Sequence, residues 1–264
     1  MAAGLSPSVP GSSPVVELRQ YTLRPGRRDV LIDLFDSKLV ESQEATGMTI
    51  IGQFRDLDRP DRFVWLRGFP DMEARAKSLA EFYAGDVWRA HSEAANATMI
   101  DTDDVLLLRP ARPGSAFRLG DSTRRAEADG AGDGVVEATI LYLEGAVGTT
   151  GAIDLFEKAI APAVTERGGT MLAYFVTDPS ENTFPSLPVR EGEEVLVWCV
   201  GLRDRPTYAR VAGRVGELRA AAAGALGSRR PPEVLRLAPT SRSLLDGRSA
   251  GLPAVKTGTR KEIR

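Results

Sequence analysis

The chain has 264 residues, 42% of them hydrophobic, and its 34 basic and 36 acidic residues leave a formal net charge of −2. A nearly neutral chain has no overall field that would attract nucleic acid or an anionic membrane, so we predict neither as a partner. A single cysteine and the lack of any run of about 18 apolar residues exclude a disulfide framework within the chain and a membrane-spanning helix, and a cytoplasmic protein is expected.

A repeated pattern divides the chain into two units. The length already suggests two domains, at about 150 residues for each. The segment VVE at residues 15–17 recurs 120 positions later at 135–137, and IDLF at 32–35 recurs 121 positions later at 153–156. Two matches at nearly one offset predict tandem copies of one small α+β domain.

The first copy, residues 15–110, follows residues 1–14, which are rich in Ala, Ser and Pro and are expected to be disordered. Alternating strand formers predict a strand at 15–23, and apolar residues at helical spacing predict a helix at 28–46. The elements expected next are strands at 49–55 and 62–69 that form a hairpin, a helix that starts at 72, is interrupted near 83–85 and resumes at 86–98, and a closing strand at 105–109.

The second copy, residues 135–240, repeats this order of elements. Its expected strands lie at 135–143, 170–177, 195–202 and 233–237, and its expected helices at 151–167 and 206–226. Residues 111–134 between the copies show no periodicity and are predicted to be a linker. The polar residues 241–264 are predicted to be a disordered tail.

Residues 17–26, with the sequence ELRQYTLRPG, resemble the opening of a NIPSNAP domain, in which an E-x-R-x-Y-x-x-x-P-G segment begins the unit. The resemblance continues through residues 63–69 and 88–110, whereas the second copy lacks the Arg, the Tyr and the Pro-Gly of the opening. NIPSNAP proteins are similar to the dimeric α/β-barrel superfamily. The resemblance therefore implies two ferredoxin-like sheets packed face to face, with helices outside and a cavity between. Such a barrel can close within one chain or between two chains of a homodimer.

Alternation along the first and third strands separates an apolar set of side chains from a polar set. The apolar set is Val16, Leu18, Val64 and Leu66, and the polar set is Glu17, Arg19, Tyr21, Trp65 and Arg67. Because helices need an apolar floor, we expect the apolar set to pack on the helices and the polar set to line a small-molecule pocket between the sheets. Glu17 and Tyr21 are then candidate catalytic groups, and Arg19, Trp65 and Arg67 candidate substrate contacts. An equally weighted alternative is a buried ionic network around Glu17 that only fixes the packing.

His91 is the only histidine and would be the natural catalytic acid or base near neutral pH. It shares a helical face with Val87 and Ala94, which makes a packed structural histidine the favoured alternative and an axial haem ligand a minor one. One histidine and one cysteine cannot build a histidine-rich metal site, and no nucleotide-binding motif occurs. We therefore predict neither a metal nor a cofactor.

An insertion at residues 178–194 follows from the recurrence of Val64-Trp65 at 197–198, which is 133 rather than 121 positions later. Three prolines among its apolar residues favour a stiff loop that folds over a cavity, with Phe184 as a plug and Arg190 as an anion contact. A loop that merely covers a sheet edge is the equally weighted alternative.

Two function classes remain after these arguments. The first is a cofactor-independent enzyme that carries out proton transfer, monooxygenase-type oxygenation or isomerase-like rearrangement on a small apolar or aromatic substrate. The second is a non-catalytic binding or scaffold protein. The interior decides between them, because an enzyme needs His91, Tyr21 or Glu17 to reach one accessible cavity, whereas a scaffold can fill its barrel with side chains.

Overall fold

The computed structural model describes residues 13–120, 124, 132–143, 148–226, 228 and 230–253. The N-terminal half contains β1 (Val15–Leu23), α1 (Arg28–Leu34), the π-helical turn η1 (Phe35–Leu39), α2 (Val40–Glu44), β2 (Thr49–Asp56), β3 (Arg62–Phe69), α3 (Met72–Ala84), α4 (Asp86–Asn96) and β4 (Met99–Pro110). The C-terminal half contains β5 (Val135–Tyr142), α5 (Gly148–Leu155), the π-helical turn η3 (Phe156–Ile160), α6 (Ala161–Glu166), β6 (Thr170–Thr177), β7 (Val195–Leu202), α7 (Arg205–Ala225) and β8 (Glu233–Pro239). The predicted order of strands and helices is confirmed in both halves.

Local chemistry accounts for the helix boundaries that matter for the site. The Asp71 carboxylate accepts a hydrogen bond from the Ala74 amide at 2.7 Å and so caps α3. Gly85, in an extended conformation, separates α3 from α4. The two π-helical turns lie 121 positions apart, and each brings a phenylalanine against a strand tryptophan, Phe35 on Trp65 at 4.9 Å and Phe156 on Trp198 at 5.3 Å between ring centroids.

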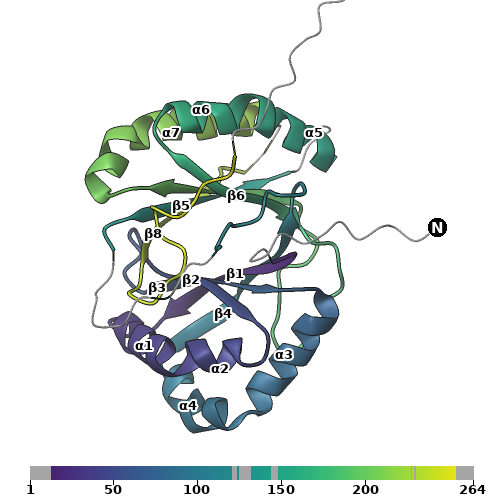
Figure 1. Cartoon of the computed structure of the whole chain (residues 1–264), viewed down its shortest axis with the longest axis vertical. Coiled ribbons are helices and arrows are strands. Elements are labelled where there is room, and N and C mark those ends of the chain that lie inside the picture. Colours follow the sequence, from purple (N-terminus) through teal and green to yellow (C-terminus); the bar gives the residue numbers. More distant parts are fainter. Residues whose placement is uncertain are drawn as a thin grey trace, which may run out of the picture.

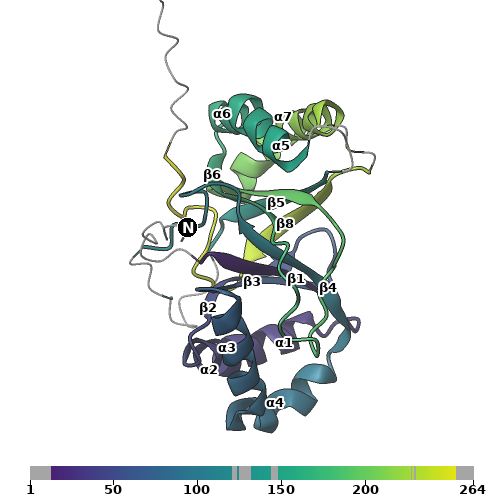
Figure 2. The ribbon, with the colours of Figure 1, turned by 90° about the vertical axis from the view of Figure 1, so that its right-hand side faces the viewer.

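The eight strands of the described part close into an antiparallel barrel in the order β1-β3-β2-β8-β5-β7-β6-β4. In Figure 1 the helices α1 to α4 cover the barrel below and α5 to α7 cover it above, and Figure 2 shows the same layers from the side. The barrel closes within one chain. None of the helices in the described residues is long and apolar enough to cross a membrane.

The two halves meet along short seams. Residues 54–56 pair with 237–239, and residues 108–110 pair with 175–177, whereas β5 and β7 pair along their whole length. Beyond the seams other segments cover the strand edges. The Arg190 amide donates to the Val105 carbonyl at 2.8 Å, and the Leu245 amide donates to the Ile51 carbonyl at 2.9 Å. The insertion therefore does cover a sheet edge, which was one of its two predicted roles.

The prediction of a disordered tail is wrong for residues 241–253. Leu245 is 1% exposed, and the Leu252 amide donates to the Met171 carbonyl at 2.7 Å. A Cβ atom on Gly247 would lie 2.0 Å from the Leu202 carbonyl oxygen, so the segment lies directly on the strands. Its apolar residues, the pair Leu244-Leu245 and Leu252, are few and show no helix or strand periodicity, so the sequence does not predict the contact. Residues 254–264 lie outside the described residues.

The beginning of the predicted linker also packs on the barrel. Phe117 is 3% exposed and its ring centroid lies 5.1 Å from that of Phe175, while the Tyr174 amide donates to the Ser115 carbonyl at 2.9 Å. Residues 111–120 are therefore part of the fold rather than a solvated linker. Most of the remaining linker, and residues 1–12 of the predicted N-terminal disorder, lie outside the described residues.

The barrel interior is an apolar core, and this overturns the expected orientation of the strands. The apolar set formed by Val16, Leu18, Val64 and Leu66 packs there with buried apolar side chains from the other six strands. The polar set faces the helices instead, and its aromatic members Tyr21 and Trp65 pack with residues of α1, η1 and α3. Alternation assigns the faces correctly, but an eight-stranded barrel is narrow enough for side chains to fill its interior, and here the apolar face fills it. The expected polar pocket between the sheets is therefore not formed by these residues.

Candidate functional site

A buried ionic cluster lies between the sheet of the N-terminal half and helix α3. Glu17 on β1 stands directly opposite Arg67 on β3, and Arg19 stands opposite Trp65. Helix α3 adds Arg75 from its buried face. We call the four charged residues Glu17, Arg19, Arg67 and Arg75 the Glu17 cluster.

The carboxylate of Glu17 is the centre of this cluster. Its Oε2 atom accepts hydrogen bonds from Arg19 Nη1 and from Arg67 Nε, each at 2.7 Å, and its Oε1 atom accepts from Arg75 Nε at 2.6 Å. All four side chains are 0% exposed. A buried ionic network around Glu17, the alternative from the sequence, is therefore present. It contains Arg75 of α3 in addition to Arg19 and Arg67 of the strands.

Aromatic side chains enclose the arginines. The guanidinium carbons of Arg67 and Arg19 lie 5.0 Å and 5.6 Å from the centroid of the Trp65 ring, within cation–π range. Arg19 Nε donates a hydrogen bond to the Tyr21 hydroxyl at 3.1 Å. The Tyr83 hydroxyl of α3 lies in the field of both Arg19 and Arg67.

Electrostatics keep Glu17 ionised. Burial alone would raise the pKa of this carboxyl, but Arg67, Arg19 and Arg75 outweigh burial and hold the pKa well below its ordinary value of 4.5. A carboxylate with a low pKa and three donors is a poor proton acceptor, which favours Glu17 as an anchor for the arginines over a catalytic base. Burial raises the pKa of Tyr83 above its ordinary value, against the opposing effect of Arg67, so its hydroxyl keeps its proton.

The insertion of the C-terminal half covers this cluster. Arg75 Nη1 donates to Asn182 Oδ1 at 3.0 Å and to Thr183 Oγ1 at 3.2 Å, and the Phe184 ring stacks on Tyr83 with centroids 5.9 Å apart. Figure 1 shows the β6–β7 connection running from the upper half down to α3. The loop thus contacts Arg75 and Tyr83 of α3, on the helix side of the sheet and not over an end of the barrel.

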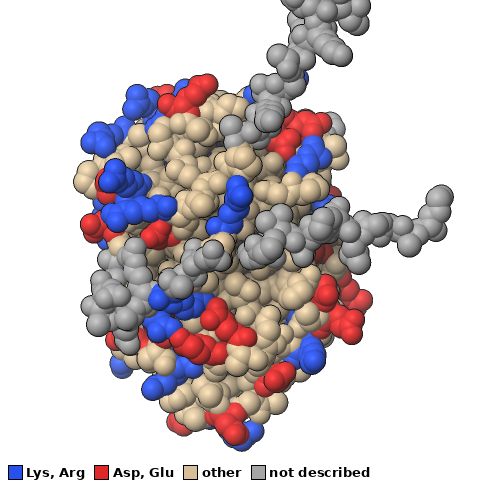
Figure 3. Space-filling model, viewed as in Figure 1, with Lys and Arg blue, Asp and Glu red and all other residues tan. Residues whose placement is uncertain are grey.

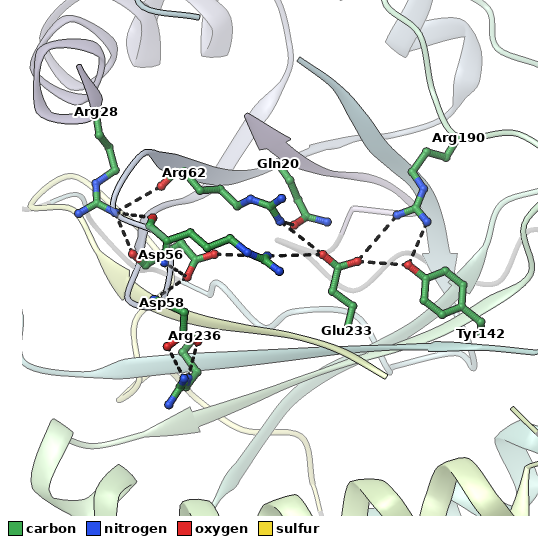
Figure 4. Close-up of polar contacts among 10 residues, drawn as sticks. Gln20, Arg28, Asp56, Asp58, Arg62, Tyr142, Arg190, Glu233 and Arg236 are labelled. Atoms are coloured by element: carbon green, nitrogen blue, oxygen red, sulfur yellow. Dashed lines mark hydrogen bonds and ion pairs between the residues drawn. The ribbon is translucent and has the colours of Figure 1, made fainter. Parts of the chain in front are cut away.

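Arg190 is not part of the Glu17 cluster. Its guanidinium donates to the Tyr142 hydroxyl at 2.9 Å and to Asp104 at 3.2 Å, and Tyr142 in turn donates to Glu233 at 3.2 Å. Figure 4 shows this second polar network, which continues through Arg62 toward the β2–β3 turn. Arg190 was predicted to contact an anion in a cavity lined by the polar set. It lies instead along β4, where its amide donates to the Val105 carbonyl, and its guanidinium is held by Asp104 and Tyr142.

His91 also lies apart from the cluster. It is half-buried on α4, and within the described residues no hydrogen bond or ion pair joins it to Glu17 or to the arginines. Its prediction as a catalytic group gains no support from this placement.

Two residues of the site were missed in the sequence. Arg75 stands at helical spacing among Met72, Leu79 and Phe82, so a lone charge on an otherwise apolar helix face was the available signal. Tyr83 stands in the predicted interruption between two helices, a position that gives no sign of a role in a site. Within the described residues, no group of three or more His, Cys, Asp or Glu side chains could hold a metal ion.

Two hollows on the surface lie elsewhere. One of about 580 Å³ runs between α6, β6 and residues 252–253 of the C-terminal half, and its lining includes none of the predicted site residues. Another of about 480 Å³ lies beneath the insertion and is lined in part by Arg190. On the face shown in Figure 3, acidic and basic side chains are interspersed, so the concentration of arginine in the Glu17 cluster is an interior feature.

The family comparison matches the N-terminal half of the chain. Residues 16–113 match the NIPSNAP family model, and a comparison with curated proteins finds no match. Among solved structures, a NIPSNAP-like domain protein from Burkholderia xenovorans is 26% identical over 36% of this chain and 84% of its own, with a TM-score of 0.34.

Two other solved structures align with nearly the whole chain. A protein from Lactobacillus acidophilus NCFM named as a proposed monooxygenase is 15% identical, with a TM-score of 0.50 over 92% of this chain and 98% of its own. An anthrone oxidase-like protein is 12% identical, with a TM-score of 0.51 over 89% of this chain and 97% of its own. At this identity the likeness concerns the fold alone. Residues 16–113 thus match the NIPSNAP domain, and the described part of the chain folds as a closed antiparallel barrel of eight strands.

Proposed function

We propose that this chain is a small-molecule-binding protein built from two tandem ferredoxin-like units, with its ligand site at the Glu17 cluster. The observation that carries the proposal is an excess of buried charge. Three fully buried arginines surround one carboxylate in the N-terminal half, and a segment of the C-terminal half closes over them. Burying charge costs several kcal/mol per ion, so a cluster with more charge than packing requires favours a functional reason.

The chemistry we propose is cofactor-independent proton transfer on a small aromatic substrate. Tyr83 and Tyr21 carry the hydroxyls that lie beside the arginines, and Tyr83, whose pKa burial raises, keeps a proton that can pass to a bound ligand. Tyr21 accepts from Arg19 and so has its own O–H free to donate. Arg19 and Arg67 would stabilise negative charge that develops on the ligand. The names of the two full-length structural neighbours, an oxidase-like protein and a proposed monooxygenase, make oxygenation with O₂ as co-substrate a reaction to test alongside.

A second candidate is ligand binding or scaffolding without turnover. It is favoured by the direction of the pKa shifts, because Glu17 titrates well below neutral pH and Tyr83 above it. General acid–base catalysis works best with a group that titrates near the working pH. The second candidate keeps the same site but removes the chemical step.

The test begins with the whole protein and a mixture of small aromatic metabolites. Native mass spectrometry identifies what is retained, and each retained compound is then assayed for turnover and for O₂ uptake. We expect Tyr83→Phe to keep the stack on Phe184 and the bound ligand while lowering kcat by about 10²-fold or more. Tyr208→Phe in the C-terminal half is the matched control and should leave kcat unchanged.

The outcomes separate the two candidates. Retained ligand with turnover that depends on Tyr83 supports the enzyme. Retained ligand with no turnover, or with turnover indifferent to both Tyr83 and Tyr21, supports the non-catalytic binder. A protein that retains nothing from the mixture contradicts the proposed site.

A further inference from the structure

The Glu17 cluster carries more positive charge than its own residues neutralise. Its three guanidinium groups face a single carboxylate, which leaves two positive charges in a fully buried region. In the described residues no other Asp or Glu forms an ion pair with Arg19, Arg67 or Arg75. A buried charge without a counter-charge is costly, so the surplus positive charge favours the binding of an anion.

The atoms that would hold such an anion are identifiable. The Nη2 atoms of Arg19, Arg67 and Arg75 are all buried, and none has a hydrogen-bond partner. Three donors in one cluster lack an acceptor, although the large majority of buried polar side-chain atoms in proteins have one. Because all three guanidinium groups bind the same carboxylate through their other nitrogens, these three donors are grouped around Glu17.

The remaining partners of the arginines are neutral. Arg67 Nη1 lies 3.4 Å from Gln43 Oε1 and 4.0 Å from Met48 Sδ, both long contacts, and Arg75 Nη1 is satisfied by Asn182 and Thr183 of the insertion. Neutral acceptors satisfy some N–H groups and leave the net charge unchanged. The structure thus supplies acceptors for the Nε and Nη1 atoms and leaves the Nη2 atoms without any.

We propose that the Glu17 cluster binds an oxyanion, a carboxylate or a phosphate, carried on a small aromatic body. This inference rests on the proposed small-molecule site and names the class of ligand. The three Nη2 atoms can each donate a charge-assisted hydrogen bond to a negatively charged oxygen, which carboxylate and phosphate offer and neutral aromatics lack. The Trp65 ring lies against Arg67, and Phe184 stacks on Tyr83, so these rings offer flat apolar surfaces to an aromatic body.

Entry requires the insertion to move. The arginines are 0% exposed, while Thr183 is exposed and Phe184 is half-buried on the outer side of the cover. Contacts that hold the cover on the cluster include two hydrogen bonds from Arg75 and the stack of Phe184 on Tyr83. Such a cover can open at modest cost and, once closed, excludes water from the bound anion, which strengthens each charge-assisted hydrogen bond.

The experiment measures binding of three probes to the full chain by calorimetry at constant ionic strength. Benzoate and phenyl phosphate carry the two oxyanions on one body, and benzamide is the neutral counterpart of benzoate. We expect benzoate or phenyl phosphate to bind at least about tenfold more tightly than benzamide, and the preferred anion identifies which oxyanion the cluster takes.

Substitutions place the binding at the cluster. Arg67→Met removes one Nη2 donor and leaves Glu17 paired with Arg19 and Arg75, and it should weaken anion binding by about 30-fold or more. Arg219→Met in the C-terminal half is the control and should bind as the unchanged protein does. If Arg67→Met does not fold, Arg19→Met serves the same purpose, because it also removes one Nη2 donor.

Failure of this inference is distinct from failure of the proposed function. If benzamide binds as tightly as the anions and Arg67→Met still weakens it, the small-molecule site stands and the oxyanion assignment is wrong. If the anions bind but Arg67→Met and Arg19→Met bind them equally well, the assignment to this cluster is wrong. If no probe and no metabolite binds, both proposals fail.

Discussion

Glu17 on β1 and Glu137 on β5 occupy corresponding places, opposite Arg67 on β3 and Val200 on β7, and they are 0% and 1% exposed. Glu17 is surrounded by three fully buried arginines. Glu137 pairs with Arg219 of α7, which is 17% exposed, and accepts a hydrogen bond from the Tyr208 hydroxyl at 3.1 Å.

The C-terminal half shows how little charge this architecture needs. One arginine from the covering helix and one tyrosine satisfy the strand carboxylate there, and the positions opposite and beside it are taken by Val200 and Thr139. In the N-terminal half, Arg75 supplies the helix arginine, so Arg19 and Arg67 are additions that the fold does not require. The comparison therefore separates a structural ion pair, common to both halves, from two further arginines that we assign to function.

The largest effect should come from the two carboxylates. Glu17→Gln leaves three buried guanidinium groups without a counter-charge and should lower the free energy of unfolding by about 3–5 kcal/mol. Glu137→Gln leaves one partly exposed guanidinium, which water can solvate, and should cost about 1–3 kcal/mol. Urea denaturation of both variants at neutral pH measures the difference, and equal costs would remove the distinction between the halves.

The pH dependence of the free energy of unfolding shows whether the cost of Glu17→Gln comes from the lost charge. The pKa of Glu17 is lower in the folded protein than its ordinary value of 4.5, so this carboxylate stabilises the fold above that pH. Its contribution is lost as the pH falls from 4.5 toward the depressed folded value. The gap in stability between the unchanged protein and Glu17→Gln should therefore be full at neutral pH and narrow in acid. A gap that stays constant down to strongly acidic pH would show that the loss is steric.

A substitution in the barrel interior tests whether both halves unfold as one cooperative unit. Leu245 lies in the apolar interior and its backbone joins the edge of β2. Leu245→Ala should cost about 2–5 kcal/mol and shift the unfolding of both halves together, because the barrel core contains residues from each. Calorimetry with Leu244→Ala as a partly buried neighbour gives the control. Two separate transitions would indicate that the halves unfold independently.

The smallest effect is expected at the surplus charge. Arg67→Met keeps an unbranched apolar stem and removes one positive charge of the surplus, so its cost should be within about 1 kcal/mol and its sign can even favour the folded state. The same measurement in urea serves here, with Arg219→Met as the matched variant that leaves Glu137 without its arginine. If Arg67→Met is the costlier of the two, Arg67 is a structural residue and the argument for its function is lost.

The order of strands and helices followed from the sequence because hydrophobic periodicity is a local property. Alternation also paired Glu17 with Arg19 and Arg67 on one face, and it kept Val16 and Leu18 on the other. What alternation cannot supply is which face turns inward, because that depends on how two sheets curve and meet. Knowledge that eight strands close into a narrow barrel reverses the assignment.

The residues that complete the site come from positions far away in the sequence. Arg75 reaches Glu17 across 58 positions, and Asn182 reaches Arg75 across 107. The sequence does not predict the docking of residues 241–253 for a related reason. Leu245 and Leu252 belong to no periodic pattern, and they are held by strand edges that exist only in the closed barrel. Contacts of this range are tertiary, and a single sequence does not display them.

Closure of the barrel within one polypeptide has a consequence for stoichiometry. In a barrel made of two identical chains, twofold symmetry places every substitution in both sheets, so the sites in the two halves remain identical. Here the two sheets are encoded separately, and Arg67 can face Glu17 while Val200 faces Glu137. The N-terminal half can therefore contain a buried charged cluster, while the C-terminal half contributes the loop that covers it. If the Glu17 cluster is the ligand site, we expect one ligand per barrel, because the C-terminal half has Val200 and Thr139 at the positions of Arg67 and Arg19.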